Sequence, residues 1–169
     1  RRTNGAAGAN TIEYSYCGLK VHMQGKGILG MRRVEERNAD LGISASMETA
    51  RRDDASLLPA LVLTRKTEGS ETSTCETSYS IFNKDNKCFA SFPVKTVTTD
   101  YDGNVSTLTR KYNSENGYLL LERQEQSDGS YEESEYSGYG RYGNMWLAGT
   151  TITRRKHADD RNEWTDTST

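Results

Sequence analysis

The second half of the chain carries turn signals at near-regular spacing. Asp102-Gly103, Asn116-Gly117 and Asp128-Gly129 separate runs that are rich in Thr, Val, Tyr and Leu. Such Asp-Gly and Asn-Gly pairs indicate β-hairpins, because both residues tolerate the positive φ values of tight turns. The spacing predicts a meander of antiparallel strands, each of roughly 8 to 10 residues or about 26 to 33 Å.

Composition favours a single sheet-rich domain. The chain has 169 residues, of which 33% are hydrophobic and only 2 are proline, and this length suits one domain. We expect a flexible leader over residues 1–10, a single antiparallel β domain over 11–156 and a polar tail over 157–169. The predicted fold class is all-β, or α+β if a short helix forms between Met47 and Leu58, with the meander forming a barrel or half-barrel.

Alternating apolar and polar residues predict further strands in the first half of the chain. Residues 35–42 read as a polar connection, and residues 83–86 read as a hairpin loop that sets Cys88 opposite Ile81. The strands expected from this pattern are 12–16, 19–23, 28–34, 43–47, 61–64, 77–82 and 87–92.

Turn geometry predicts the pairing in the second half. A two-residue turn at Asp102-Gly103 sets Val97 opposite Leu108. A three-residue loop at 127–129 pairs Arg123 with Glu133, which avoids placing glutamates opposite each other. A glycine-rich connection over 138–144 then leads into a strand over 145–154.

Charge and hydropathy exclude two classes of partner. The formal net charge is −2 and the sequence pI is about 5.8, so no overall positive field exists to hold nucleic acid. No apolar run approaches the roughly 20 residues that span a bilayer. We therefore expect a soluble protein that is not membrane-spanning, and the small, polar leader favours a secreted or periplasmic location.

Three cysteines, Cys17, Cys75 and Cys88, permit one internal disulfide at most. The hairpin register places Cys75 and Cys88 about 20 Å apart, which is too far for a bridge between them. A bridge from Cys17 to either of the others and a set of free thiols both remain open.

The chain lacks any spacing typical of a catalytic or metal site. His22 and His157 lie in separate elements and outside any Cys/His cluster, and no phosphate loop or nucleophile motif is present. We expect no enzyme activity, no metal and no cofactor.

Aromatic residues gather around a Gly-Tyr-Gly-Arg-Tyr-Gly stretch near the end of the meander. Tyr139, Arg141 and Tyr142 are candidates for an interaction surface, because aromatic side chains cover large areas at low entropic cost. The alternative is that these rings simply pack against the sheet.

Residues 102–111, followed by 117–122, resemble a late hairpin of the intracellular fatty-acid-binding proteins, which are calycin-like β-barrels. Thr151-Ile152-Thr153-Arg154 is similar to the closing strand of that family. The resemblance implies that Arg110 and Arg154 hold a ligand carboxylate, for which a guanidinium is well suited. Tyr112, Tyr136 and Trp146 are the further candidate ligand-binding residues. A second resemblance, to open half-barrel carriers of lipoproteins in the bacterial periplasm, depends on the succession of hairpins.

Two hypotheses follow. The first is a non-enzymatic β-cup that binds a lipid or another small apolar ligand. The second is a structural or interaction module, such as a coat, appendage or accessory subunit, that binds other protein subunits through strand edges and the Tyr-rich loop.

Overall fold

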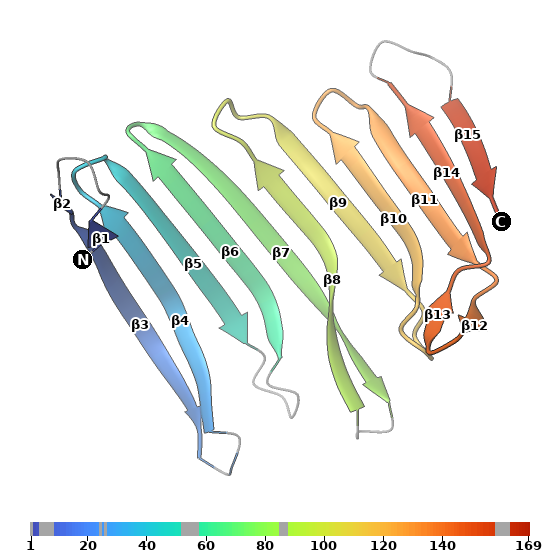
Figure 1. Cartoon of the computed structure of the whole chain (residues 1–169), viewed down its shortest axis with the longest axis horizontal. Helices are drawn as coiled ribbons and strands as arrows, with labels where there is room; N and C mark the ends of the chain where they lie inside the picture. Colours follow the sequence, from blue (N-terminus) through green and yellow to red (C-terminus); the bar gives the residue numbers. More distant parts are fainter. Residues whose placement is uncertain are drawn as a thin grey trace.

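The computed structural model describes residues 2–3, 9–23, 25, 27–51, 58–84, 88–157 and 163–169, and these ranges form strands and turns with no helix. Eleven of the strands make one sheet (Figure 1). Two short hairpins, β1–β2 and β12–β13, form separate two-stranded sheets. The strands are β1 (Arg2–Thr3), β2 (Ala9–Asn10), β3 (Ile12–His22), β4 (Gly27–Asn38), β5 (Ile43–Arg51), β6 (Pro59–Glu68), β7 (Glu71–Lys84), β8 (Cys88–Thr99), β9 (Val105–Tyr112), β10 (Leu119–Gln126), β11 (Tyr131–Ser137), β12 (Gly140–Tyr142), β13 (Met145–Leu147), β14 (Thr150–Lys156) and β15 (Glu163–Ser168).

The large sheet follows the order of the sequence. Each strand from β3 to β11 pairs antiparallel with the next, and β14 and β15 continue the series after the β12–β13 hairpin. The predicted antiparallel meander is therefore confirmed. β1 and β2 lie in the segment that the sequence assigned to the leader, and β15 lies in the segment assigned to the polar tail.

The sheet is open. β3 and β15 form its two opposite edges, and within the described sheet each pairs with a single neighbour (Figure 1). A barrel requires the first and last strands to pair, so of the two predicted alternatives, a barrel or a half-barrel, the closed barrel is not formed. No helix in the described ranges is long and apolar enough to cross a membrane.

Registers define two faces of the sheet. A row of direct partners runs through Val34, Met47, Thr64 and Cys75, and we call this side the Val34 face. Side chains alternate along each strand, so the other side carries the row that contains Arg33, which we call the Arg33 face. The Arg33 row continues through Glu48, Leu63, Glu76 and Val97.

No hydrophobic side chain in the described ranges is buried. Even large side chains remain open to solvent, for example Met23 at 90% and Ile28 at 73% of their full exposure. The sheet is a single layer (Figure 1), so a side chain has only its neighbours on the same face to pack against. Backbone ladders and cross-strand side-chain pairs therefore hold these strands together.

The third predicted hairpin is confirmed in its register. Arg123 is the direct partner of Glu133, and the backbone N–H of Gln126 donates to the Ser130 carbonyl over 2.9 Å. Gly129 has a φ of 85°, so it supplies the left-handed residue that a three-residue loop needs.

The register predicted around Asp102 is wrong by one residue, because Val97 pairs with Thr107 and Leu108 pairs with Thr96. The Asp100 carboxylate accepts hydrogen bonds from the backbone N–H of Asp102 and of Asn104, each over 2.9 Å. This side chain organises a wider turn than the two-residue turn that Asp102-Gly103 suggested.

The register predicted for the 83–86 loop is also wrong, since Cys88 pairs with Lys84 and Ile81 pairs with Ser91. Two strand boundaries differ as well. β4 runs on to Asn38 through the expected polar connection, and the strand expected over 145–154 is divided into β13 and β14. β5 occupies residues up to Arg51, where a short helix was the alternative, and residues 52–57 lie outside the described ranges.

Candidate interaction surface

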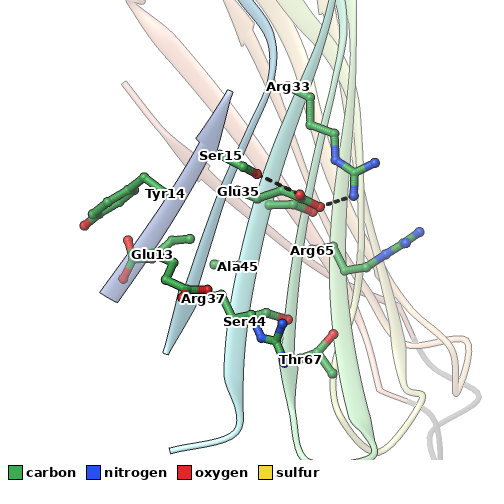
Figure 2. Close-up of a pocket in the computed structure, with 12 residues that line it drawn as sticks. Glu13, Tyr14, Ser15, Arg33, Glu35, Arg37, Ser44, Ala45, Arg65 and Thr67 are labelled. Atoms are coloured by element: carbon green, nitrogen blue, oxygen red, sulfur yellow. Dashed lines mark hydrogen bonds and ion pairs between the residues drawn. The ribbon is translucent and has the colours of Figure 1, made fainter. Parts of the chain in front are cut away.

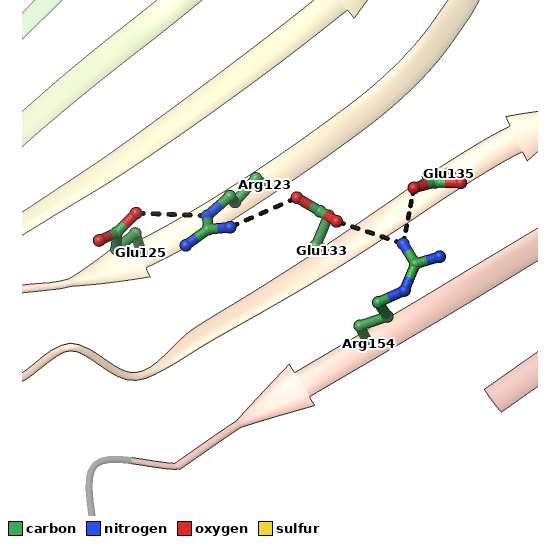
Figure 3. A network of polar contacts seen from close by, with 5 residues as sticks. All are labelled: Arg123, Glu125, Glu133, Glu135 and Arg154. Carbon is green, nitrogen blue, oxygen red and sulfur yellow. Dashed lines mark hydrogen bonds and ion pairs between the residues drawn. The ribbon is translucent and has the colours of Figure 1, made fainter. Parts of the chain in front are cut away.

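Arg154 takes part in a charged network on the Arg33 face (Figure 3). Its guanidinium lies 2.6 Å from the Glu135 carboxylate and 3.3 Å from that of Glu133. Arg123 extends the network to Glu133 at 3.5 Å and to Glu125 at 3.2 Å. The hydrogen bond with Glu135 raises the pKa of Arg154. These contacts link β10, β11 and β14, so the candidate ligand arginine is bound to carboxylates of its own chain.

Arg110 lies on the opposite face from Arg154. Its Nε donates to the Glu122 carboxylate over 2.5 Å, and the two residues are direct partners in β9 and β10. Cys75 pairs with Thr98, and Thr98 pairs with Ser106, so Ser106 lies on the Val34 face. Arg110 is four residues further along the same strand and therefore lies on that face too. The structure thus separates the two arginines that the resemblance assigned to one carboxylate.

The aromatic candidates for ligand binding also lie apart. The ring of Tyr112 stacks on Phe92 with centroids 4.6 Å apart, and its hydroxyl donates to the Pro93 carbonyl. Burial raises the pKa of Tyr112. Tyr136 is half-buried in β11, opposite Thr151. Tyr112 and Arg110 line one hollow of about 650 Å³ on the described part of the sheet, and its lining includes neither Tyr136 nor Trp146.

Tyr139 fixes the β12–β13 hairpin to the sheet. Its hydroxyl donates to the Leu119 carbonyl, and its ring centroid lies 4.6 Å from that of Tyr118. Burial raises the pKa of Tyr139. Trp146 of the same hairpin packs 5.8 Å from Tyr118. Tyr139 is therefore an internal anchor, whereas the sequence placed it on an interaction surface.

The other side of this hairpin is apolar and exposed. Tyr142 pairs with Met145, and Leu147 pairs with Gly140. Alternation places these side chains on the side of the hairpin opposite Trp146, which contacts the sheet. Tyr142 is 77% exposed, Met145 63% and Leu147 49%, and we call these three residues the hairpin patch. Arg141, the direct partner of Trp146, lies on the other side of the hairpin; it is exposed and donates to the Gly143 carbonyl over 3.0 Å.

The Val34 face carries a hollow of about 410 Å³, which we call the apolar hollow. It is centred on β4 to β7 and flanked by Tyr14 of β3 and Thr98 of β8. Its floor is formed by direct partners in neighbouring strands, and three charged residues, Glu36, Arg65 and Lys66, also line it. Each strand contributes only one or two of its apolar residues, so no local sequence pattern indicated it. The side chains that give the hollow its character are Tyr14, Val34, Ala45, Met47 and Cys75.

The Arg33 face carries a polar hollow of about 680 Å³ over β3 to β6 (Figure 2). Glu35 forms an ion pair with Arg33 and accepts a hydrogen bond from Ser15 over 2.9 Å. Arg37 and Arg65 also line this hollow. The first strands of the sheet are thus amphipathic, with charged residues on one face and the apolar hollow on the other.

The described cysteines are free thiols. Cys17 in β3 is exposed and Cys75 in β7 is half-buried, and the four strand spacings between them amount to about 19 Å. Cys88 opens β8 opposite Lys84, whereas Cys75 pairs with Thr98. A bridge between Cys75 and Cys88 is therefore excluded, as the sequence analysis expected.

Metal chemistry has no support in the described part of the chain, where no three His, Cys, Asp or Glu side chains gather in a way that could hold an ion. Comparisons with known proteins add no relative: no family model, no curated protein and no solved structure matches the chain.

Proposed function

We propose that this protein is a non-enzymatic structural or interaction module that is completed by association with other polypeptide chains. The observation that carries this proposal is the large exposed surface of the single-layer sheet. The chain exposes 11889 Å², whereas a compact monomer of 18.9 kDa exposes about 8,300 Å². The difference of about 3,600 Å² on one chain is larger than the share of one partner in most obligate interfaces, which bury about 2,000 to 5,000 Å² over both partners together.

Exposed apolar side chains support the same conclusion. A monomeric domain of this length ordinarily buries a core, yet here residues such as Tyr16, Leu19 and Trp164 are between 53% and 60% exposed. Tyr16 and Leu19 lie in edge strand β3, and Trp164 lies in edge strand β15. Edge strands with apolar side chains are templates for pairing with another chain.

Sedimentation velocity of the purified chain, from about 1 to 100 µM, tests the proposal. We expect oligomers whose population rises with concentration. The double substitution Tyr16→Lys and Leu19→Lys places charges on the β3 edge and should weaken association, while Ser114→Lys in an exposed turn is the control for added charge. A chain that remains monomeric over the whole range would contradict the proposal.

The apolar hollow favours a second candidate function, the binding of a lipid or another small apolar ligand. An acyl chain gains about 0.8 kcal/mol for each buried methylene, and Lys66 lines the hollow, where it forms an ion pair with Glu68 over 2.5 Å. Native mass spectrometry after gentle purification, together with titration of an apolar fluorescent probe, tests this function. Met47→Lys should abolish both the co-purified lipid in the mass spectrum and the response of the probe. Absence of both signals from the unmodified chain would exclude ligand binding.

A further inference from the structure

We propose that copies of this chain bind one another head to tail, with the hairpin patch of one copy packed into the apolar hollow of the next. This inference rests on the proposed function, because it names the partner and the two surfaces through which association occurs. The patch consists of Tyr142, Met145 and Leu147, and the centre of the hollow consists of Val34, Met47 and Cys75.

The hairpin presents the patch in a fixed orientation. Tyr139 and Trp146 contact Tyr118, at the start of β10, so the opposite side of the hairpin faces away from the sheet. That outward side carries no charged residue, since its four positions are Gly140, Tyr142, Met145 and Leu147. Its exposed apolar side chains therefore bring no charge of their own to the contact, and the charges to be desolvated are those that line the hollow, Glu36, Arg65 and Lys66.

The hollow has the dimensions that a two-stranded hairpin requires. Its centre extends over four strands, β4 to β7, and three strand spacings amount to about 14 Å, while Tyr14 of β3 and Thr98 of β8 flank this centre. Sheets that pack face to face lie about 10 Å apart, so the hairpin side chains reach the floor when β12 and β13 lie over this region. Met145 of the patch and Met47 of the floor are both flexible and adapt to irregular contacts.

Contact between the two surfaces within one copy is prevented by the order of the strands. The hairpin is fixed at the start of β10, the hollow is lined by residues of β3 to β8, and β9 lies between them. Figure 1 shows the hairpin at one corner of the sheet, beside β10. The patch of one molecule therefore reaches a hollow only on another molecule.

A second copy of the chain is the partner that the surface area supports. Every copy supplies one patch and one hollow, so the two surfaces occur in equal number. A standard interface buries about 800 Å² on each partner, and a copy engaged on both sides would cover about 1,600 Å² of the 3,600 Å² surplus. The contact is heterologous, and repetition of such a contact forms a ring or a filament.

Complementing variants test the inference. The hairpin variant Tyr142→Ser/Met145→Ser and the hollow variant Met47→Lys should each weaken self-association about tenfold or more. An equal mixture of the two variants should form a 1:1 dimer, because one intact patch and one intact hollow remain. The control variant Ile28→Ser/Leu41→Ser removes residues that are 73% and 57% exposed elsewhere and should associate like the unmodified chain.

The reactivity of two thiols, Cys75 and Cys17, measures the same contact without any substitution in the hollow. Alkylation of Cys75 should slow as the protein concentration rises, whereas alkylation of the exposed Cys17 should keep its rate. In the hairpin variant, Cys75 should react at one rate over the whole concentration range. This measurement keeps the inference testable if the hollow variant fails to fold.

Several outcomes would overturn the inference. Association of the unmodified chain that both variants leave unchanged would refute this contact while the proposed function stands. Dimers formed by the hollow variant alone would show that patches pack on each other. An unmodified chain that stays monomeric at all concentrations would refute both the inference and the proposed function.

Discussion

Arg110 and Arg154 lie on opposite faces of one sheet, each in contact with a glutamate of a neighbouring strand. One carboxylate cannot be held by both guanidiniums, because the thickness of the sheet separates them. Their common role is to neutralise acids within the sheet, Glu122 for Arg110 and the pair Glu133 and Glu135 for Arg154.

The two arginines should differ in their effect on stability. The Glu133 side chain is 17% exposed and the Glu122 side chain is 34% exposed. Arg154→Gln removes the partner of Glu135 and leaves Glu133 with Arg123, at 3.5 Å, whereas Arg110→Gln affects Glu122. Loss of a partner costs more when the remaining charge is less solvated, so Arg154→Gln, which affects two carboxylates, should lower the Tm more than Arg110→Gln. Thermal unfolding followed by circular dichroism measures both. The double variant Arg154→Gln/Glu133→Gln should recover part of the loss, and equal effects of the two single variants would contradict the assignment.

The turn between β8 and β9 should become less stable in acid. The Asn104 side chain and nearby backbone N–H groups lower the pKa of Asp100 from its ordinary value near 3.8. A lowered pKa in the folded state contributes stability that is present above the ordinary value and is lost as pH falls through the folded value. Asp100→Asn should therefore have a lower Tm than the unmodified chain at pH 7. The difference should shrink as pH falls below 3.8 and the Asp100 carboxylate becomes protonated, and a difference that is independent of pH would show that the charge has no role.

At the base of the hairpin, an added methyl group should be tolerated at Gly140 and not at Gly149. A Cβ at Gly149 would lie 2.6 Å from the Gly138 carbonyl oxygen, whereas a Cβ at Gly140 would meet nothing within 4 Å. Backbone must move to admit Gly149→Ala, which should displace the hairpin and change the surroundings of Trp146. Trp146 fluorescence in a Trp164→Phe background reports this change. Gly140→Ala is the control and should leave the spectrum unaltered.

Substitutions at Tyr139 and Tyr142 should have different effects, although the two residues lie three positions apart. The first should lower stability and the second should weaken association. Tyr139→Phe removes the hydrogen bond to the Leu119 carbonyl and should cost roughly 1 kcal/mol, the usual net value of such a bond. Tyr142→Ser should leave the Tm unchanged and weaken association. Chemical denaturation and sedimentation of the two variants measure these effects. Reversal of the two results would show that Tyr142 is the anchor.

The sequence was sufficient for most strands of the large sheet and for one register, since alternation and Asp-Gly pairs act locally. The register that places Arg123 opposite Glu133 followed from the cost of facing glutamates and was confirmed. The register around Asp102 failed because the Asp100 side chain organises the turn. The β12–β13 hairpin was missed because each of its strands has three residues, too few to show alternation.

The faces of the sheet could not be read from single strands. The apolar hollow joins Val34, Met47 and Cys75 from strands far apart in the sequence. The sequence also could not predict that the described strands form an open sheet, because hairpin spacing is the same in an open meander and in a barrel. For that reason, the resemblance around Arg110 and Arg154 did not predict where these side chains lie.

The large sheet has an odd number of strands, eleven, and antiparallel alternation therefore gives β3 and β15 the same direction. If copies were joined edge to edge by simple translation, β15 would run parallel to β3 of its neighbour. Antiparallel junctions that keep the Val34 face on one side require every second copy to be turned by 180° about the sheet normal. A continuous sheet of this kind would alternate two seams, β3 with β3 and β15 with β15, and blocking either seam would stop its growth at pairs.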